Sequence, residues 1–205
     1  MLQIEIEGTP IGGEDSRESS WVERIVNANR LPDVTLRFRL EPHRKVDLDN
    51  LVRPAMRALR ISRYYTNGFP ELCSLSAKKE FGGSVGLTIE AGAQLCPDTP
   101  LLETTFDSIP PSEAAAEWKE QWRNSIQAGW AKEPLMRPVW ISLATTSKRS
   151  LVDLLKPIID GLEPLLGRDP SGRLQFCPND EFVHWLQIRR TEVGPALHLT
   201  AGVLD

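Results

Sequence analysis

Two stretches of the chain repeat the same order of apolar and polar positions. Residues 34–40 and 139–143 alternate between apolar and polar side chains, which predicts a half-buried strand in each. A helical pattern follows each strand, over residues 50–59 and 153–162, and Leu, Pro and Leu coincide when these two segments are aligned. Agreement over both a strand and a helix predicts that the chain contains a repeated unit.

The proline shared by the two helical segments has a physical place near a helix start. If Asn50 and Asp153 are the N-caps, Pro54 and Pro157 are the fourth helical residues. The first backbone N–H groups of a helix have no partner within it, so we expect a proline to be tolerated near the helix start. We therefore expect the two helices to begin at these caps.

Each unit contains a further helix upstream and two further strands downstream. Ser20 and Glu23 have the spacing of a capping box, which predicts a helix over residues 21–30, and apolar residues at helical spacing predict another over 115–126. Strand-like runs close the units at residues 72–81, 87–92, 183–190 and 197–202. The predicted order in each unit is strand, helix, strand, helix, strand, strand.

This order predicts an α+β fold with mixed, largely antiparallel strands, built from two tandem units. We place the first unit at residues 1–95 and the second at 101–205, joined by a turn-rich stretch near 96–100. Such a tandem duplication is expected to fold as an intramolecular pseudo-dimer. Two faces of like shape would then bury each other around an approximate two-fold axis.

The composition excludes several classes of protein. Of the 205 residues, 40% are hydrophobic and 25% charged. No apolar run approaches the roughly 20 residues that span a bilayer, so we expect no membrane association, and residues 1–7 do not resemble a signal peptide. Cys73, Cys96 and Cys177 form no CxxC pair, which argues against a disulfide framework or zinc ribbon and favours a reducing cytoplasm. The three histidines form no HExxH motif, which argues against a His-based metal site or a Ser-His-Asp triad.

A basic segment lies within a chain whose net charge is −4. The net charge alone argues against a protein that binds nucleic acid. Residues 30–63, however, hold nine Arg or Lys residues against four acidic ones. Two interpretations stay open: a solvated charged face, or a strip that binds phosphate groups.

The segment with the most specific chemistry follows the first predicted strand. Asp47 and Asp49 lie two residues apart in extended chain before a helix, so their carboxylates can point the same way and share a divalent cation. Arg44, Lys45 and Arg53 are near enough to hold phosphate oxygens while the metal activates water. The alternative is that Asp47 and Asp49 only favour the start of a helix.

Residues 44–53, which read Arg-x-x-Asp-Leu-Asp-Asn-Leu-x-Arg, resemble the signature segment of the RusA family of Holliday-junction resolvases. Residues 156–162 resemble the helix of that family, and residues 178–190 resemble its later turn and strand. The resemblance implies a small, Mg²⁺-dependent (or Mn²⁺-dependent) endonuclease that cuts four-way junctions. It also implies branched or double-stranded DNA as the partner, and a homodimeric arrangement that one duplicated chain would imitate.

The first unit departs from the family pattern after the helix begins. It keeps Asp47 and Asp49 but has Arg53 where the family has lysine. An arginine can clamp a phosphate but does not readily give up a proton. Where the family has a pair of aspartates, the first unit offers Glu71 as the only acid in reach.

The second unit departs in the opposite way. It keeps Asp180 and Lys156, but residues 150–153 read Ser-Leu-Val-Asp, so both aspartates of the motif are missing. Either the two units together form one composite metal site, or both sites have decayed and the protein binds DNA or a protein partner without cutting. The acidic net charge favours the second account, and the basic segment around Asp47 favours the first.

The resemblance and the spacing together predict a set of site residues. The predicted metal ligands are Asp47, Asp49 and Asp180, with Glu71 as a further candidate. The predicted catalytic residues are Asp47, Asp49, Asp180 and Arg53. The predicted contacts to nucleic acid are Arg37, Arg39, Arg44, Lys45, Arg53, Arg57, Lys148, Arg149 and Lys156.

Overall fold

The computed structural model describes residues 3–12, 17–25, 33–59, 72–92, 94–97 and 99–204, without the side chains of residues 19 and 22. The strands are β1 (Gln3–Glu7), β2 (Asp33–Leu40), β3 (Ser74–Phe81), β4 (Gly86–Ala91), β5 (Leu102–Phe106), β6 (Val139–Thr145), β7 (Val183–Arg190) and β8 (Leu197–Val203). The helices are α1 (Glu18–Ile25), α2 (Leu48–Leu59), α3 (Ala116–Gly129), α4 (Leu151–Asp160), α5 (Glu163–Leu166) and the single 3₁₀ turn η2 (Asp180–Phe182). The predicted mixed α+β class is confirmed.

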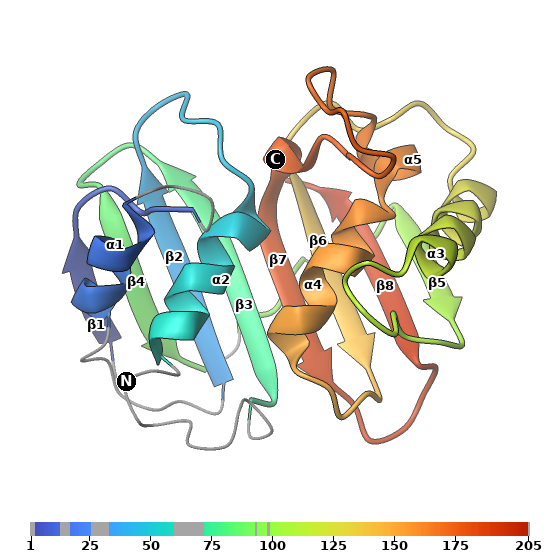
Figure 1. Ribbon diagram of the computed structural model, residues 1–205, viewed down its shortest axis with the longest axis horizontal. Helices are drawn as coiled ribbons and strands as arrows, with labels where there is room; N and C mark the ends of the chain where they lie inside the picture. Colours follow the sequence, from blue (N-terminus) through green and yellow to red (C-terminus); the bar gives the residue numbers. More distant parts are fainter. Residues whose placement is uncertain are drawn as a thin grey trace.

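The strands of the described chain form one mixed sheet in the order β1-β4-β2-β3-β7-β6-β8-β5 (Figure 1). From the β1 edge inward the order is β1-β4-β2-β3, and from the β5 edge inward it is β5-β8-β6-β7. In each half the second strand pairs in parallel with the third and antiparallel with the fourth. The halves therefore have the same strand connectivity.

The two halves meet along one pair of strands. β3 and β7 run antiparallel, with Ala77 opposite Leu186 and Leu75 opposite Ile188. We expected two faces to bury each other. The halves instead join edge to edge, because each would otherwise leave a strand with unpaired backbone groups.

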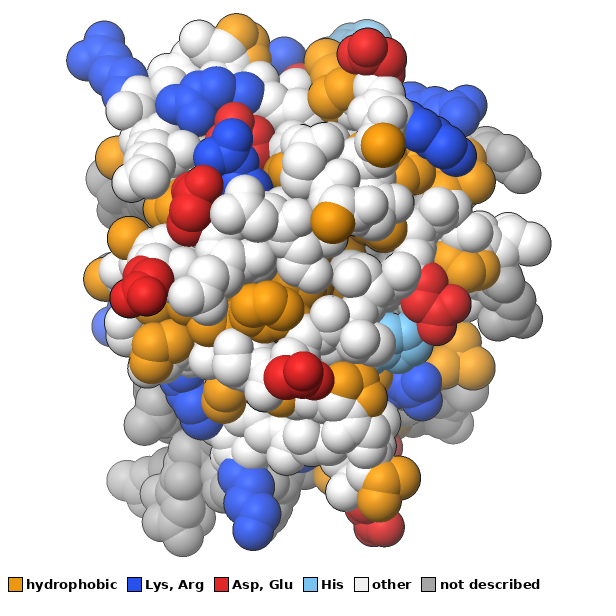
Figure 2. Space-filling model, turned by 90° about the vertical axis from the view of Figure 1, so that its right-hand side faces the viewer, with side chains coloured by type: hydrophobic (Ala, Val, Ile, Leu, Met, Phe, Trp, Pro, Cys, Tyr) orange, Lys and Arg blue, Asp and Glu red, His pale blue; other side chains and the backbone are white. Residues whose placement is uncertain are grey.

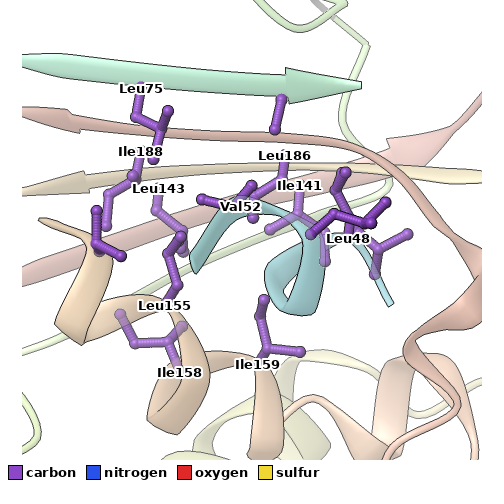
Figure 3. Close-up of a cluster of buried hydrophobic side chains, with 14 of the residues drawn as sticks. Leu48, Val52, Leu75, Ile141, Leu143, Leu155, Ile158, Ile159, Leu186 and Ile188 are labelled. Carbon is purple, nitrogen blue, oxygen red and sulfur yellow. The ribbon is translucent and has the colours of Figure 1, made fainter. Parts of the chain in front are cut away.

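The helices lie on one face of this sheet, with α2 and α4 in contact over its centre (Figure 1). Alternation along the strands turns apolar side chains toward them. Leu75 of β3, Leu143 of β6 and Ile188 of β7 point toward Val52 of α2 and Leu155 of α4 (Figure 3). One hydrophobic core therefore spans both halves.

The segment that connects the halves crosses the opposite face of the sheet. The backbone carbonyl of Gln94 accepts hydrogen bonds from Ser76 Oγ at 2.8 Å and from Gln187 Nε2 at 3.2 Å. Ser76 lies on β3 and Gln187 on β7, and the two residues face each other in the ladder. The connection therefore ties together the same two strands on which the halves meet.

Three helix starts differ from those expected. Ser20 lies inside α1, where its hydroxyl bonds to the Arg17 carbonyl, so the capping box does not form. Asn50 also lies inside a helix, because α2 begins at Leu48 and the Asp47 carbonyl accepts the Leu51 N–H at 3.2 Å. In α4 the N-cap is Ser150, whose hydroxyl accepts the Asp153 N–H.

Both prolines are consequently inside their helices rather than in the first turn. A proline at such a position removes one backbone hydrogen bond. Both helices differ from the expectation in this same way, and each follows the second strand of its half.

No helix in the described ranges has the length and apolar character needed to cross a membrane.

Replacing Ile188 by alanine should weaken the whole fold. Its side chain is fully buried at the join between the halves. Removing buried methyl and methylene groups leaves a cavity, and we expect a loss of about 2–5 kcal/mol in the free energy of unfolding. Urea denaturation followed by circular dichroism measures this, with Val193→Ala, 84% exposed, as the neutral control. Equal stability of the Ile188 variant and wild type would show that the join is not part of the core.

Candidate functional site

The predicted acids of the two halves come together at one end of the β3–β7 pair. Asp47 immediately precedes α2, Asp49 lies in its first turn, and Asp180 opens η2 just before β7. Lys79 of β3 links these segments, since its Nζ donates to the Val46 carbonyl at 3.0 Å and to the Glu181 carbonyl at 2.7 Å. The buried ammonium group of Lys79 therefore holds together the two segments that carry the acids, one before α2 and one before β7.

Lys156 of α4 lies among the carboxylates. Its Nζ is 3.0 Å from Asp160 Oδ1, 3.8 Å from Asp49 Oδ2 and 4.0 Å from Asp180 Oδ2. The other oxygen of Asp160 accepts from Lys119 Nζ at 2.7 Å. Residues of both halves thus form one charged cluster, which we call the acid cluster: Asp47, Asp49, Asp160, Asp180 and Lys156.

Asp49 is the least satisfied member of the acid cluster. Its side chain is 1% exposed, and neither carboxylate oxygen accepts a hydrogen bond from any residue that the structure describes. Burial raises the pKa of Asp49 to about 6, although the nearby Lys156 ammonium opposes this shift. A buried carboxylate without hydrogen bonds is costly, which marks this position as a candidate for binding a cation.

Asp180 is held in its protonated form at neutral pH. Burial and the negative charges of Asp47 and Asp49 raise its pKa to about 9, against the weaker influence of Lys156. The protonated carboxyl is within hydrogen-bonding reach of Asp47. The Asp47 carboxylate in turn accepts from Asn50 Nδ2 at 3.1 Å. Carboxylates this close share protons because they cannot all be charged without a compensating cation.

The two lysines of the site differ in their electrostatics. Burial lowers the pKa of Lys79 to about 8 despite the acids around it. Burial opposes the charged form of Lys156 as well, but the carboxylates of Asp49 and Asp160 outweigh it and raise its pKa. Lys156 is therefore a permanent cation, while Lys79 loses its proton more readily than an ordinary lysine.

Two pockets adjoin at the acid cluster. One, of about 360 Å³, is lined by Asp47 and Asp180. The other, of about 380 Å³, is lined by apolar and aromatic side chains that include Phe81 and His184, whose rings lie 5.3 Å apart. Lys45 lines both. The first pocket is therefore mainly acidic and the second mainly apolar and aromatic, with Lys45 between them.

The acid cluster has the donor chemistry of a Mg²⁺ or Mn²⁺ site but not its final geometry. Carboxylate oxygens are the ligands that these hard cations prefer, and Asp49 offers two that are not engaged in hydrogen bonds. Among the described residues, however, no three His, Cys, Asp or Glu side chains are already grouped to hold a metal ion. The Lys156 ammonium lies where a cation would be attracted, so it must withdraw before a metal binds.

The predicted phosphate-binding residues near α2 are engaged in ion pairs. Arg53 makes a two-pronged contact with Glu113, at 3.2 and 2.8 Å. Arg57 pairs with Glu18, and Lys45 Nζ lies 3.1 Å from Glu181 Oε2. Arg44 lines the pocket that holds Phe81. Of these four residues, Lys45 lines the pocket of Asp47 and Asp180 and Arg44 lines the adjoining pocket, whereas Lys156, another predicted contact, belongs to the acid cluster itself.

The remaining predicted basic residues lie elsewhere. Arg37 and Arg39 project from β2 on the face away from the helices, where Arg37 pairs with Glu80 and Glu90 and Arg39 with Glu5. Arg149 donates to the Pro110 carbonyl, and Lys148 is exposed. Glu71 falls outside the described residues. The described basic residues between positions 33 and 59 therefore do not form a single strip. Basic and acidic side chains are also interspersed over the side of the molecule that carries α3 and β5 (Figure 2).

Three residues of this site were not anticipated from the sequence. They are Lys79, Lys119 and Asp160. Lys79 has the same parity as Leu75 and Ala77 in its strand, which is the signal that it points inward. Asp160 lies four residues after Lys156, a spacing that places both on one side of a helix.

Comparison with models of known protein families gives no match, and comparison with curated proteins gives no significant match either. The family resemblance of the sequence therefore rests on its short motifs alone.

Raising the pH from 6.5 to 8 should lower the thermal stability of the protein. In the unfolded chain Asp180 is ionised throughout this range, whereas in the folded state its pKa is about 9. The folded state therefore binds more protons, and unfolding becomes easier as the pH rises. Two groups oppose this slope in part, because burial lowers the pKa of His184 from 6.5 to about 4 and that of Lys79 from 10.5 to about 8. The unfolded chain then binds more protons at these groups, at His184 near pH 6.5 and at Lys79 near pH 8, but neither difference reaches the full proton that Asp180 holds across the range. The pKa of Asp49, about 6, lies below the range.

Melting temperatures measured at fixed ionic strength across this range test the effect. Asp180→Asn imitates the protonated carboxyl and should fold, but its melting temperature should fall less steeply with pH. Asp153→Asn, at an exposed acid of α4, should keep the wild-type slope. Parallel slopes for wild type and Asp180→Asn would contradict the assignment of the proton to this cluster.

Proposed function

We propose that the protein is a RusA-like, divalent-metal-dependent endonuclease that acts on branched DNA such as four-way junctions. One observation carries the proposal: Asp49 of the first half and Asp180 of the second both lie within 4.0 Å of the Lys156 ammonium. Each half of the sequence lacks part of the family's acid set, and we propose that Asp180 of the second half completes the set begun by Asp47 and Asp49 of the first.

The strand order supports the view that the chain is a duplicated unit. Both halves have the same connectivity, and their equivalent strands β3 and β7 pair antiparallel at the centre. Antiparallel pairing of equivalent strands is what a two-fold axis between two copies produces. The proposed unit boundaries at residues 95 and 101 lie on the segment that crosses the open face of the sheet.

The proposed roles follow from position. Asp47, Asp49 and Asp180 would hold Mg²⁺ or Mn²⁺, which would supply an activated water and stabilise charge on the phosphodiester. Lys45, whose side chain is 80% exposed, can exchange Glu181 for a phosphate oxygen at little cost. Lys156 would leave its place between Asp49 and Asp180 and remain held by Asp160, its closest partner at 3.0 Å.

The adjoining aromatic pocket supports DNA as the substrate. Phe81 is 42% exposed at the end of β3, and it shares the wall of this pocket with Arg44 and Lys45. Aromatic side chains beside basic ones bind unstacked bases while the basic groups hold the backbone. A strand with its phosphate at Asp47 could therefore place a neighbouring base against Phe81.

A second candidate function is a RusA-like protein that binds DNA or a protein partner without cutting. The observation that favours it is the Lys156 ammonium, which already neutralises the carboxylates that a metal would need. In this case a junction is bound with an affinity that falls steeply with salt, and no product forms when Mg²⁺ or Mn²⁺ is added.

Asp47→Asn should abolish cutting of a synthetic four-way junction in Mg²⁺ or Mn²⁺. Even partners behind a metal ligand contribute about 10- to 100-fold, so loss of a ligand should reduce incision by about 100-fold or more. End-labelled junctions on denaturing gels measure this, and Asp153→Asn should cut at the wild-type rate. Cutting that survives Asp47→Asn would place the chemistry elsewhere, and binding without any wild-type product would favour the second candidate.

A further inference from the structure

The two halves do not offer equivalent sites to the two strands of a symmetric junction. α2 and α4 follow the equivalent strands β2 and β6, and they contact each other over the centre of the sheet. When their first residues, Leu48 and Leu151, are aligned, the internal prolines Pro54 and Pro157 coincide. Each residue of the acid cluster on α2 or α4 thus has a definite counterpart.

The counterparts of the two motif aspartates cannot bind a cation. Ser150 takes the place of Asp47, and its hydroxyl serves as the N-cap of α4 by accepting the Asp153 N–H. Val152 takes the place of Asp49 and is 7% exposed in the core. A capping hydroxyl and an aliphatic side chain do not provide the anionic oxygens that Mg²⁺ or Mn²⁺ requires.

The counterparts of Lys156 and Asp160 carry positive charge. Arg53 corresponds to Lys156 and is bound by both oxygens of Glu113, while Arg57 corresponds to Asp160 and pairs with Glu18. Each of these guanidinium groups is paired with a glutamate, and neither can coordinate a cation. Among the described residues, the second position therefore lacks the carboxylate ligands that a divalent cation needs.

We infer that the protein is a nicking endonuclease that makes one incision in each junction it binds. The inference rests on the proposed function and deepens it. In the step, water adds across one phosphodiester: a new P–O bond forms to the water oxygen, one P–O bond breaks, and the departing oxygen takes up a proton. Separation of a four-way junction into two duplexes needs two such steps in opposing strands, and the described residues of this chain provide ligands for one.

A negatively supercoiled plasmid with a long inverted repeat tests this directly. The repeat extrudes as a cruciform, which is a four-way junction, and plasmid in excess over protein ensures that each molecule meets at most one copy. Two incisions by one bound protein give linear DNA. One incision gives a nicked circle, whose released supercoiling reabsorbs the cruciform and removes the substrate.

With Mg²⁺ or Mn²⁺ we expect nicked circles and no linear DNA above the level without protein. Asp47→Asn should give neither product, and Asp153→Asn should give nicked circles as wild type does; circular dichroism checks that both variants are folded. Linear DNA formed in proportion to protein under excess plasmid would overturn the inference while leaving the endonuclease proposal in place. The absence of any incision by wild type would overturn the endonuclease proposal, and the inference with it.

Discussion

The antiparallel pairing of β3 with β7 is the constraint on which the rest of the molecule depends. It converts two four-stranded halves into one sheet and lets α2 and α4 share a single apolar core. It also places the end of β3 beside the start of β7. Lys79 can then bind the chain on both sides, through the carbonyls of Val46 and Glu181. The acids gather as a consequence of sheet formation.

Stability and chemistry conflict within the acid cluster. Burying Asp49 without hydrogen bonds and Asp180 beside other carboxylates costs free energy, and Lys156 and Lys119 offset only part of it. Burial of the apolar core beneath, which includes Leu75 and Ile188, contributes the free energy of folding that offsets the rest of this cost. Buried charged groups that destabilise the folded state and lie close together are typical of functional sites.

Apolar alternation was sufficient to predict β7 at both ends and β2 to within one residue, because these strands lie at or near the centre of the sheet with one face buried. The helix starts were wrong at Ser20, Asn50 and Asp153, since polar residues that can cap a helix also fit its first turns. The meeting of Asp49 with Asp180 depends on long-range strand pairing, which spacing along the chain does not encode. Lys79 was missed because a lysine in a strand usually faces water.

The two halves belong to one polypeptide, and between them the Gln94 carbonyl accepts hydrogen bonds from Ser76 of β3 and Gln187 of β7 across the open face of the sheet. In an assembly of identical subunits every substitution occurs twice, once on each side of the axis. Within a single polypeptide it occurs once. Under the proposed duplication, one half can therefore carry Ser150 and Val152 where the other carries Asp47 and Asp49, an inequality that a symmetric pair of identical subunits cannot have.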